Sequence, residues 1–186
     1  MGMSAPRGTP PSHAVGTVDR VVAAIDGVST ATGWFAGWLI VPMTLAMAYE
    51  VVARYAFHAP TKWTYEVSYM TYGAQFMLAS AYTLLKGGHI RTDVFYERWS
   101  ARTRAVIDAL CYLLFFFPGL LFILYAGAVE TVFAWEIGER TGLRIGSVPF
   151  PMYLFKGVIP MTAALLLLQG LSELIRCGRA IRRRAP

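Results

Sequence analysis

Four long blocks of apolar residues, each close to the length of a membrane span, constrain this chain more than any other feature. Residues 33–49 are uncharged and continue past Glu50 to Ala53, residues 67–85 and 109–129 are uncharged, and residues 152–172 contain one charge, Lys156. A helix needs about 20 apolar residues to cross roughly 30 Å of hydrocarbon. Because lipid cannot satisfy exposed backbone groups, and the blocks do not alternate as barrel strands do, we predict transmembrane helices.

The composition agrees with this assignment. The chain has 186 residues, of which 56% are hydrophobic and 15% charged, whereas about a quarter of a typical soluble domain is charged. We predict an all-α membrane protein with four transmembrane helices at about 33–53, 64–85, 105–133 and 152–174, within a domain of residues 31–177. A cleaved signal peptide at the first block is disfavoured, because the apolar run is longer than a usual signal core.

The ends of the chain differ from this domain. Residues 1–14 are rich in Pro, Gly and Ser and are predicted to form a flexible tail. Residues 15–30 have apolar side chains at helical spacing, with Asp19 and Asp26 off the apolar stripe. We favour an amphipathic helix lying flat on the membrane surface, and the alternative is a helical extension of the first span. Residues 178–186 are predicted to be a basic cytoplasmic tail.

The basic residues predict the orientation of the spans. Of the 17 Lys and Arg residues, 12 lie in the N-terminal region, the second loop and the C-terminal region. Positive residues remain on the cytoplasmic side, so both termini and the second loop are expected there. The formal charge of +6 is then explained by contact with anionic lipid headgroups. We predict no nucleic-acid partner, because no basic groove with interleaved aromatic residues is visible.

The end of the first span and the start of the second contain the densest group of polar residues. Glu50 and Arg54 are four residues apart and can pair on one helical face, while Trp63 and Glu66 open the next helix. One interpretation is that these charges only cap two helix ends. The other is a cluster that holds the hairpin and docks a neighbouring protein, because charges near hydrocarbon are costly without partners.

The second span is the most polar of the four. Polar residues recur at helical spacing and form one stripe along the helix, namely Thr64, Ser68, Thr71, Gln75 and Tyr82. Such a stripe is expected to face protein, where hydroxyl and amide groups find partners. The sequence leaves open whether that protein is this chain or another subunit.

Three smaller features predict local geometry. Gly33 and Gly37 have the GxxxG spacing that allows close helix approach, although this spacing also arises often by chance. Pro42 and Pro118 predict bends in the first and third spans. Ser100 is expected to cap the helix that follows it.

No pattern of an enzyme or a metal site is present. Cys111 and Cys177 form no CxxC pair, and neither phosphate-binding glycine motif occurs. We therefore predict no enzyme activity, no catalytic residue and no bound cofactor or metal. The alternative function is a membrane-anchor subunit of a redox or other multi-subunit complex. A b-type haem would need histidine ligands inside the spans, and His13, His58 and His89 lie in tails or loops.

Several segments carry a family resemblance. They are Glu50, the run from Arg54 to Pro60, Trp63, Glu66, the second-loop run Gly88, His89, Ile90, Arg91, Thr92 and Asp93, and the later segments 156–160 and 168–171. Across residues 33–177 the chain resembles the small permease subunit of tripartite ATP-independent periplasmic (TRAP) transporters. It is most similar to the branch labelled for mannitol or chloroaromatic compounds.

The resemblance implies a bacterial inner-membrane system of three proteins. This small subunit would act with a large multi-spanning permease subunit and a periplasmic solute-binding protein to import organic acids or related small solutes with a sodium gradient. The large subunit would hold the solute and sodium, and the small one would brace it. The structural or subunit-interface candidates are Glu50, Arg54, Trp63, Glu66, Gln75, Gly88, His89, Arg91 and Asp93. The remaining partners would be membrane lipids.

Overall fold

The structure is a computed structural model that describes residues 17–61, 63–87, 100–145 and 148–183. The expected flexible tail of residues 1–14 lies outside the described residues. So does the second-loop group Gly88, His89, Arg91 and Asp93. The described chain consists of long helices joined by short turns and one β-hairpin.

Two helices in series form the first long element. Helix α1 covers Thr17–Trp38 and α2 covers Ile40–Ala56, with Leu39 between them in a helical backbone conformation. Pro42 has no N–H to donate to the carbonyl of Trp38, and its ring would collide with that carbonyl. This accounts for the interruption of the helix at Leu39, one turn before the proline, and the bend predicted from Pro42 lies here.

The interfacial helix expected over residues 15–30 is not a separate element. Helix α1 runs without interruption through residues 17–38, so the amphipathic segment and the start of the first span belong to one helix. Gly27 does not break it. The Cβ of a side chain at that position would meet nothing within 4 Å, and helical glycine costs only about 1 kcal/mol relative to alanine. The arrangement is that of a helical extension, which was the alternative interpretation.

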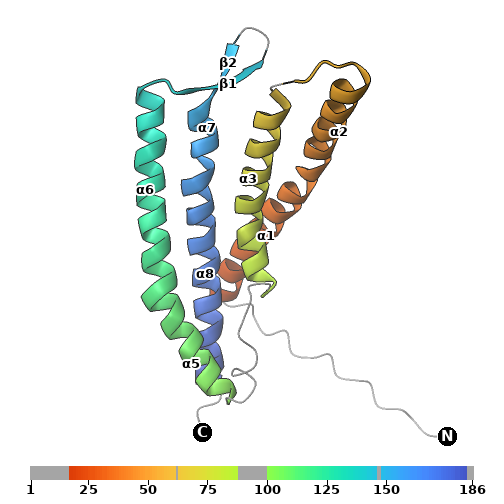
Figure 1. Cartoon of the computed structure of the whole chain (residues 1–186). Coiled ribbons are helices and arrows are strands. Elements are labelled where there is room, and N and C mark those ends of the chain that lie inside the picture. The colour runs from red at the N-terminus through yellow and green to blue at the C-terminus, as the bar shows by residue number, and fades with distance from the viewer. Residues whose placement is uncertain (1–16, 62, 88–99, 146–147, 184–186) are drawn as a thin grey trace, which may run out of the picture.

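The second and third long elements run in opposite directions (Figure 1). Helix α3 covers Trp63–Leu85. Helix α5 covers Ala101–Cys111, a π-helical turn η1 covers Tyr112–Phe116, and α6 covers Phe117–Glu136. Ser100 caps α5 by accepting a hydrogen bond from the Thr103 N–H at 3.2 Å, as predicted. The π turn directly precedes Pro118, because a wider turn relieves the clash between a proline ring and the preceding turn.

One correction to an all-α fold is the hairpin after α6. Strands β1 (Arg140–Ile145) and β2 (Val148–Pro151) pair antiparallel. The chain enters the hairpin through Gly138, which has a φ of 62°, a conformation that glycine adopts readily. The strand pairing supplies backbone hydrogen bonds that an irregular loop would lack.

The last long element is longer than expected. Helix α7 covers Met152–Lys156 and α8 covers Val158–Arg183. Helix α8 therefore passes the expected span end at 174 and includes most of the segment 178–186 that was expected to be a basic tail. Arginine is a good helix former, which allows the helix to continue.

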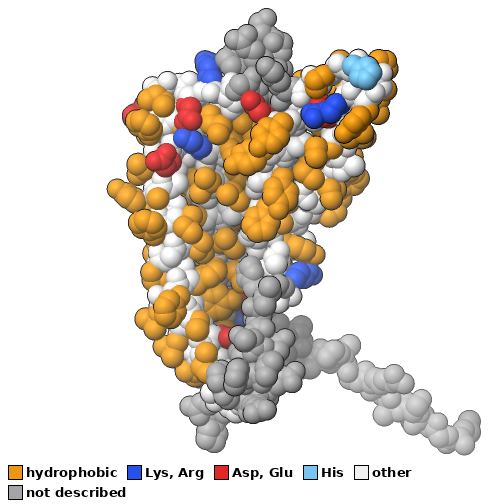
Figure 2. All heavy atoms as spheres, viewed as in Figure 1, with side chains coloured by type: hydrophobic (Ala, Val, Ile, Leu, Met, Phe, Trp, Pro, Cys, Tyr) orange, Lys and Arg blue, Asp and Glu red, His pale blue; other side chains and the backbone are white. Residues whose placement is uncertain are grey.

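The helices form an open row, not a closed bundle (Figure 1). Helix α3 packs against α1, α2 and α8, while α6 packs against α7 and α8 and has at most marginal contact with α1, α2 or α3. Small side chains fill the contacts between neighbours, so most of the buried apolar residues are alanines: Ala36, Ala46, Ala53, Ala81, Ala134 and Ala163. A row leaves two broad outer surfaces. In the view of Figure 2 hydrophobic side chains cover the middle of one surface, and most charges lie near the end that carries the β-hairpin.

Three helical segments of the described chain are long and apolar enough to cross a membrane. They are Thr17–Ala56, Val106–Glu136 and Met152–Arg179. Helix α3 has 23 residues, enough to span about 30 Å, but its tyrosines, threonines and Gln75 reduce its apolar character below that of the other three. The second predicted span is therefore supported by length and position and not by composition.

Candidate functional site

The first site is the connection between α2 and α3, where Glu50 holds the two helices together. Arg54 donates hydrogen bonds from Nε and Nη2 to Glu50 Oε1, at 3.0 and 2.6 Å. The backbone N–H of Thr61 donates to Glu50 Oε2 at 3.0 Å, and the Thr61 hydroxyl donates to the same oxygen. The Thr61 and Thr64 hydroxyls are 2.7 Å apart, and Thr64 is buried. We call Glu50, Arg54, Thr61 and Thr64 the first clasp.

The turn beside the first clasp is shaped by its backbone. His58 has a φ of 50°, a left-handed conformation that is uncommon outside glycine. The N–H of Ala59 donates to the carbonyl of Ala53 at 3.0 Å, which folds the chain back on α2. The Tyr49 and Trp63 rings lie 5.6 Å apart. Trp63, the first residue of α3, thus packs on the end of α2, beside the charged pair.

Two of the sequence candidates lie outside the first clasp. Oxygen Oε2 of Glu66 and oxygen Oε1 of Gln75 are buried, and neither has a hydrogen-bond partner among the described residues. The Ser68 hydroxyl is likewise buried without a hydrogen-bond partner among the described residues. An unsatisfied buried polar atom is costly, so these three side chains mark the least well satisfied polar positions of α3.

A second clasp, formed by Lys156, Glu139 and Glu130, lies at the same end of the row and ties α7 to α6 and to the turn that follows α6. The Lys156 ammonium donates to Glu139 Oε2 at 2.7 Å, and Glu130 Oε2 is 3.8 Å away. The Trp135 and Tyr153 rings meet edge to face with centroids 4.5 Å apart. Lys156, the one charge of the fourth apolar block, is therefore paired across the hairpin connection.

A third clasp, at the other end of the row, joins α1 to α8 and was missed from the sequence. Ser29 donates to Gln169 Oε1 at 2.6 Å, and both side chains are buried. Asp26 Oδ1 accepts from Gln169 Nε2 at 3.2 Å and from Ser172 Oγ at 3.1 Å. Arg176 forms an ion pair with Asp26 Oδ2. Gln169 and Ser172 are fully buried. The network therefore supplies the hydrogen bonds that water would otherwise make to these polar groups.

In the third clasp the acidic side of α1 faces α8, whereas the expected interfacial helix would have turned that side toward water. Val18, Val21 and Val28 of the apolar stripe are about half exposed, while Asp26 faces α8. Asp19 also pairs with Arg179. The spacing that could have revealed this is in α8, where polar residues recur at one helical face as Gln169, Ser172, Glu173 and Arg176.

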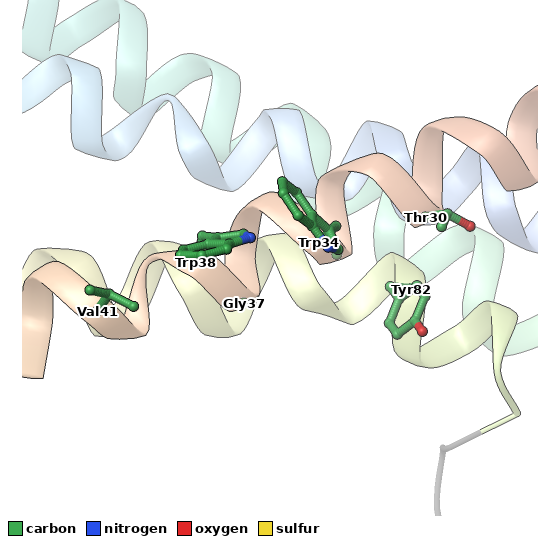
Figure 3. A pocket seen from close by; sticks show the side chains of 7 residues that line it. Thr30, Trp34, Gly37, Trp38, Val41 and Tyr82 are labelled. Carbon is green, nitrogen blue, oxygen red and sulfur yellow. The ribbon is translucent and has the colours of Figure 1, made fainter.

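An open groove runs beside the contact of α1 and α3 (Figure 3). Its volume is about 480 Å³, and it is lined by Thr30, Gly33, Trp34, Gly37, Trp38, Val41 and Tyr82. A Cβ at Gly33 would lie 2.4 Å from Cβ and Cγ of Tyr82, whereas a Cβ at Gly37 would meet nothing within 4 Å. Only the first glycine of the GxxxG pair therefore permits close helix approach within this chain.

The comparisons with known proteins decide the family. A family model described as tripartite ATP-independent periplasmic transporters, DctQ component, matches residues 43–180, which is most of the chain. The chain belongs to the DctQ family. No curated protein and no solved structure matches it. The matched residues of this DctQ component include the first and second clasps and the α8 half of the third.

Membership establishes the general role. A DctQ component is a small membrane subunit of a TRAP transporter, and the family is one of transporter components, not of enzymes. The apolar helices agree with a protein of the inner membrane. A tripartite transporter implies two further proteins, a large permease and a solute-binding protein, as partners of this DctQ component.

Proposed function

We propose that this chain is the static scaffold subunit of a sodium-coupled, binding-protein-dependent transporter that imports organic acids or related small solutes. Within the family we assign it to the branch labelled for mannitol or chloroaromatic compounds. Solute and sodium bind the large permease, and this subunit braces that permease in the membrane. The observation that carries the proposal is the open row of helices held by three polar clasps, within a chain of the DctQ family.

The distribution of charge favours a bracing role and argues against a transport path through this chain. The paired charges of the three clasps lie near helix ends, where Glu50 meets Arg54, Glu139 meets Lys156, and Asp26 meets Arg176. A solute path usually shows broken helices that meet near the middle of the membrane. The interruption at Leu39 has no matching interruption at mid-height of α3 or α8 in the described chain.

We also propose that α3 crosses the membrane, which brings the number of spans to four, and that both termini are cytoplasmic. Helix α3 lies between α2 and α8 in the row, parallel to neighbours that are apolar enough to cross the membrane (Figure 1). The start of α1 and the end of α8 lie at the same end of the row, as an even number of spans requires. Arg20, Lys86, Arg104 and Arg179 gather toward that end, and positive residues favour the cytoplasmic side.

Sodium-dependent solute uptake in reconstituted vesicles tests the proposal. The large permease and the binding protein are expected to transport only when this subunit is also present, and this subunit alone is expected neither to bind nor to move solute. Full uptake without this chain would refute the scaffold role. Uptake that requires this chain but ignores the sodium gradient would refute only the coupling ion.

A further inference from the structure

The outer face of α3 carries a row of exposed aromatic side chains. Tyr65, Tyr69, Tyr72 and Phe76 follow one another at steps of four, three and four residues, which places them on one helical face. They are 77%, 60%, 60% and 68% exposed. The Tyr69 ring lies beside Phe155 of α7, with centroids 6.1 Å apart, but all four side chains remain mostly exposed. We call these four residues the aromatic row.

Lipid is a poor cover for the aromatic row. Tyr72 is nine residues beyond Trp63, so it lies about 13 Å along a helix that spans roughly 35 Å, well away from both headgroup regions. The hydroxyls of Tyr65, Tyr69 and Tyr72 have no hydrogen-bond partner among the described residues. Hydrocarbon offers a hydroxyl nothing to bind, and tyrosine is favoured at the headgroup level instead.

The outer face of α6 shows what a lipid-facing surface of this chain looks like. Its exposed side chains are mostly hydrocarbon, for example Leu121, Phe122 and Val132, and its one exposed tyrosine is Tyr125. The segment that includes α6 is the most apolar of the candidate spans. Helix α3 is not among those candidate spans, because it is less apolar than they are.

A second observation at the aromatic row indicates a protein partner. A groove of about 320 Å³ runs beside it, lined by Tyr72, Gln75, Phe76, Ala79, Ser80 and Thr83. Ser80 and Thr83 donate to carbonyls of their own helix at 3.0 Å, but Gln75 Oε1 is buried without a partner. Small residues such as Ala79 and Ser80 let another helix approach closely.

We propose that the aromatic row and its groove are the docking surface for the large permease subunit. A membrane helix of that subunit lies along α3 and places hydrogen-bonding side chains opposite Tyr69, Tyr72 and Gln75. The inference rests on the proposed function, because it takes the large permease as the partner. It goes further by assigning the interface to α3 and by leaving the outer face of α6 to lipid.

Photo-crosslinking in membranes that contain both full-length subunits tests this assignment. The photoreactive amino acid benzoylphenylalanine replaces Tyr69, Tyr72 or Phe76, and in a control it replaces Phe122, which is 71% exposed on α6. We expect crosslinks to the large permease from the three α3 positions and none from position 122. Crosslinks from position 122 alone, from α3 to lipid alone, or from α3 to a second copy of this chain would each overturn the inference.

A second measurement removes only the hydroxyls. The double variant Tyr69→Phe, Tyr72→Phe keeps ring shape, and we expect the large permease to bind it roughly tenfold more weakly in mild detergent, about threefold for each hydrogen bond lost in a membrane. Tyr125→Phe is the matched control on α6 and is expected to bind as the wild type does. Equal weakening by both changes, or none by the double variant, contradicts the assignment. Failure of the wild-type subunits to associate at all would instead refute the proposed function.

Discussion

The contact of α1 with α3 at Gly33 allows a sharp test of the packing. Gly33→Ala would place a Cβ 2.4 Å from Cβ and Cγ of Tyr82, atoms close to the α3 backbone that cannot swing away, while Gly37→Ala meets nothing within 4 Å. Both changes gain about 1 kcal/mol of helix propensity. Overpacking at Gly33 costs about 1–3 kcal/mol. Since the propensity gain is common to both variants, their difference in unfolding free energy isolates the overpacking.

The assay is equilibrium unfolding of the purified subunit in detergent micelles, followed by the fluorescence of its tryptophans. We expect Gly37→Ala to be up to about 1 kcal/mol more stable than the wild type, and Gly33→Ala to lie about 1–3 kcal/mol below Gly37→Ala. Adding Tyr82→Ala to Gly33→Ala should recover part of that difference, because the two sites are in contact and their effects are not additive. Equal stability of the two glycine variants would refute the proposed geometry of the α1–α3 contact.

Three further predictions concern the three clasps and Glu66. Gln169→Leu leaves the Ser29 hydroxyl and the Asp26 carboxylate short of partners and should destabilise the subunit by about 1–3 kcal/mol in the same unfolding assay; unchanged stability would contradict the buried network. Lys156→Met removes the hydrogen bond to Glu139 and should speed limited proteolysis of the 140–151 hairpin, whereas Lys156→Arg should not. Arg54→Ala or Glu66→Gln should reduce co-purification of the large permease with little change in the apparent solute affinity, and an intact complex with weakened solute affinity would count against this.

The helical elements were predictable because membrane helices depend on local rules. The apolar blocks located α3, the α5–α6 element and α7–α8 to within a few residues, except where α8 continued through basic residues to Arg183. Pro42 marked the interruption of the first helix, and Ser100 marked the start of α5. The hairpin of β1 and β2 was not predictable, because its pairing depends on where α6 and α7 place its two ends.

In the candidate site, contacts between residues close in sequence were predictable and contacts between distant residues were not. Glu50 and Arg54 lie four residues apart on one helix, so their pairing followed from spacing alone. The partners Asp26 and Arg176 are separated by 150 residues, and nothing in either segment identifies the other. Amphipathic spacing misled in α1 because a helix beside lipid can turn its charges inward and its valines outward, the reverse of a helix beside water.

The length of the first helical element has a consequence for how the subunit fits its membrane. The element Thr17–Ala56 has 40 residues, about 60 Å of helix, against roughly 45 Å for a bilayer with its headgroups. A straight helix of that length would fit within the bilayer only if it leaned by about 40°, and the break at Leu39 divides this lean between α1 and α2. The third clasp ties α1 to α8, and the first clasp ties the end of α2 to the start of α3. A change in bilayer thickness would therefore alter the helix angles at both clasps. A thinner membrane would tilt α1 and α2 further. The thickness of the surrounding lipid would thereby set the angle of these two helices to the membrane normal.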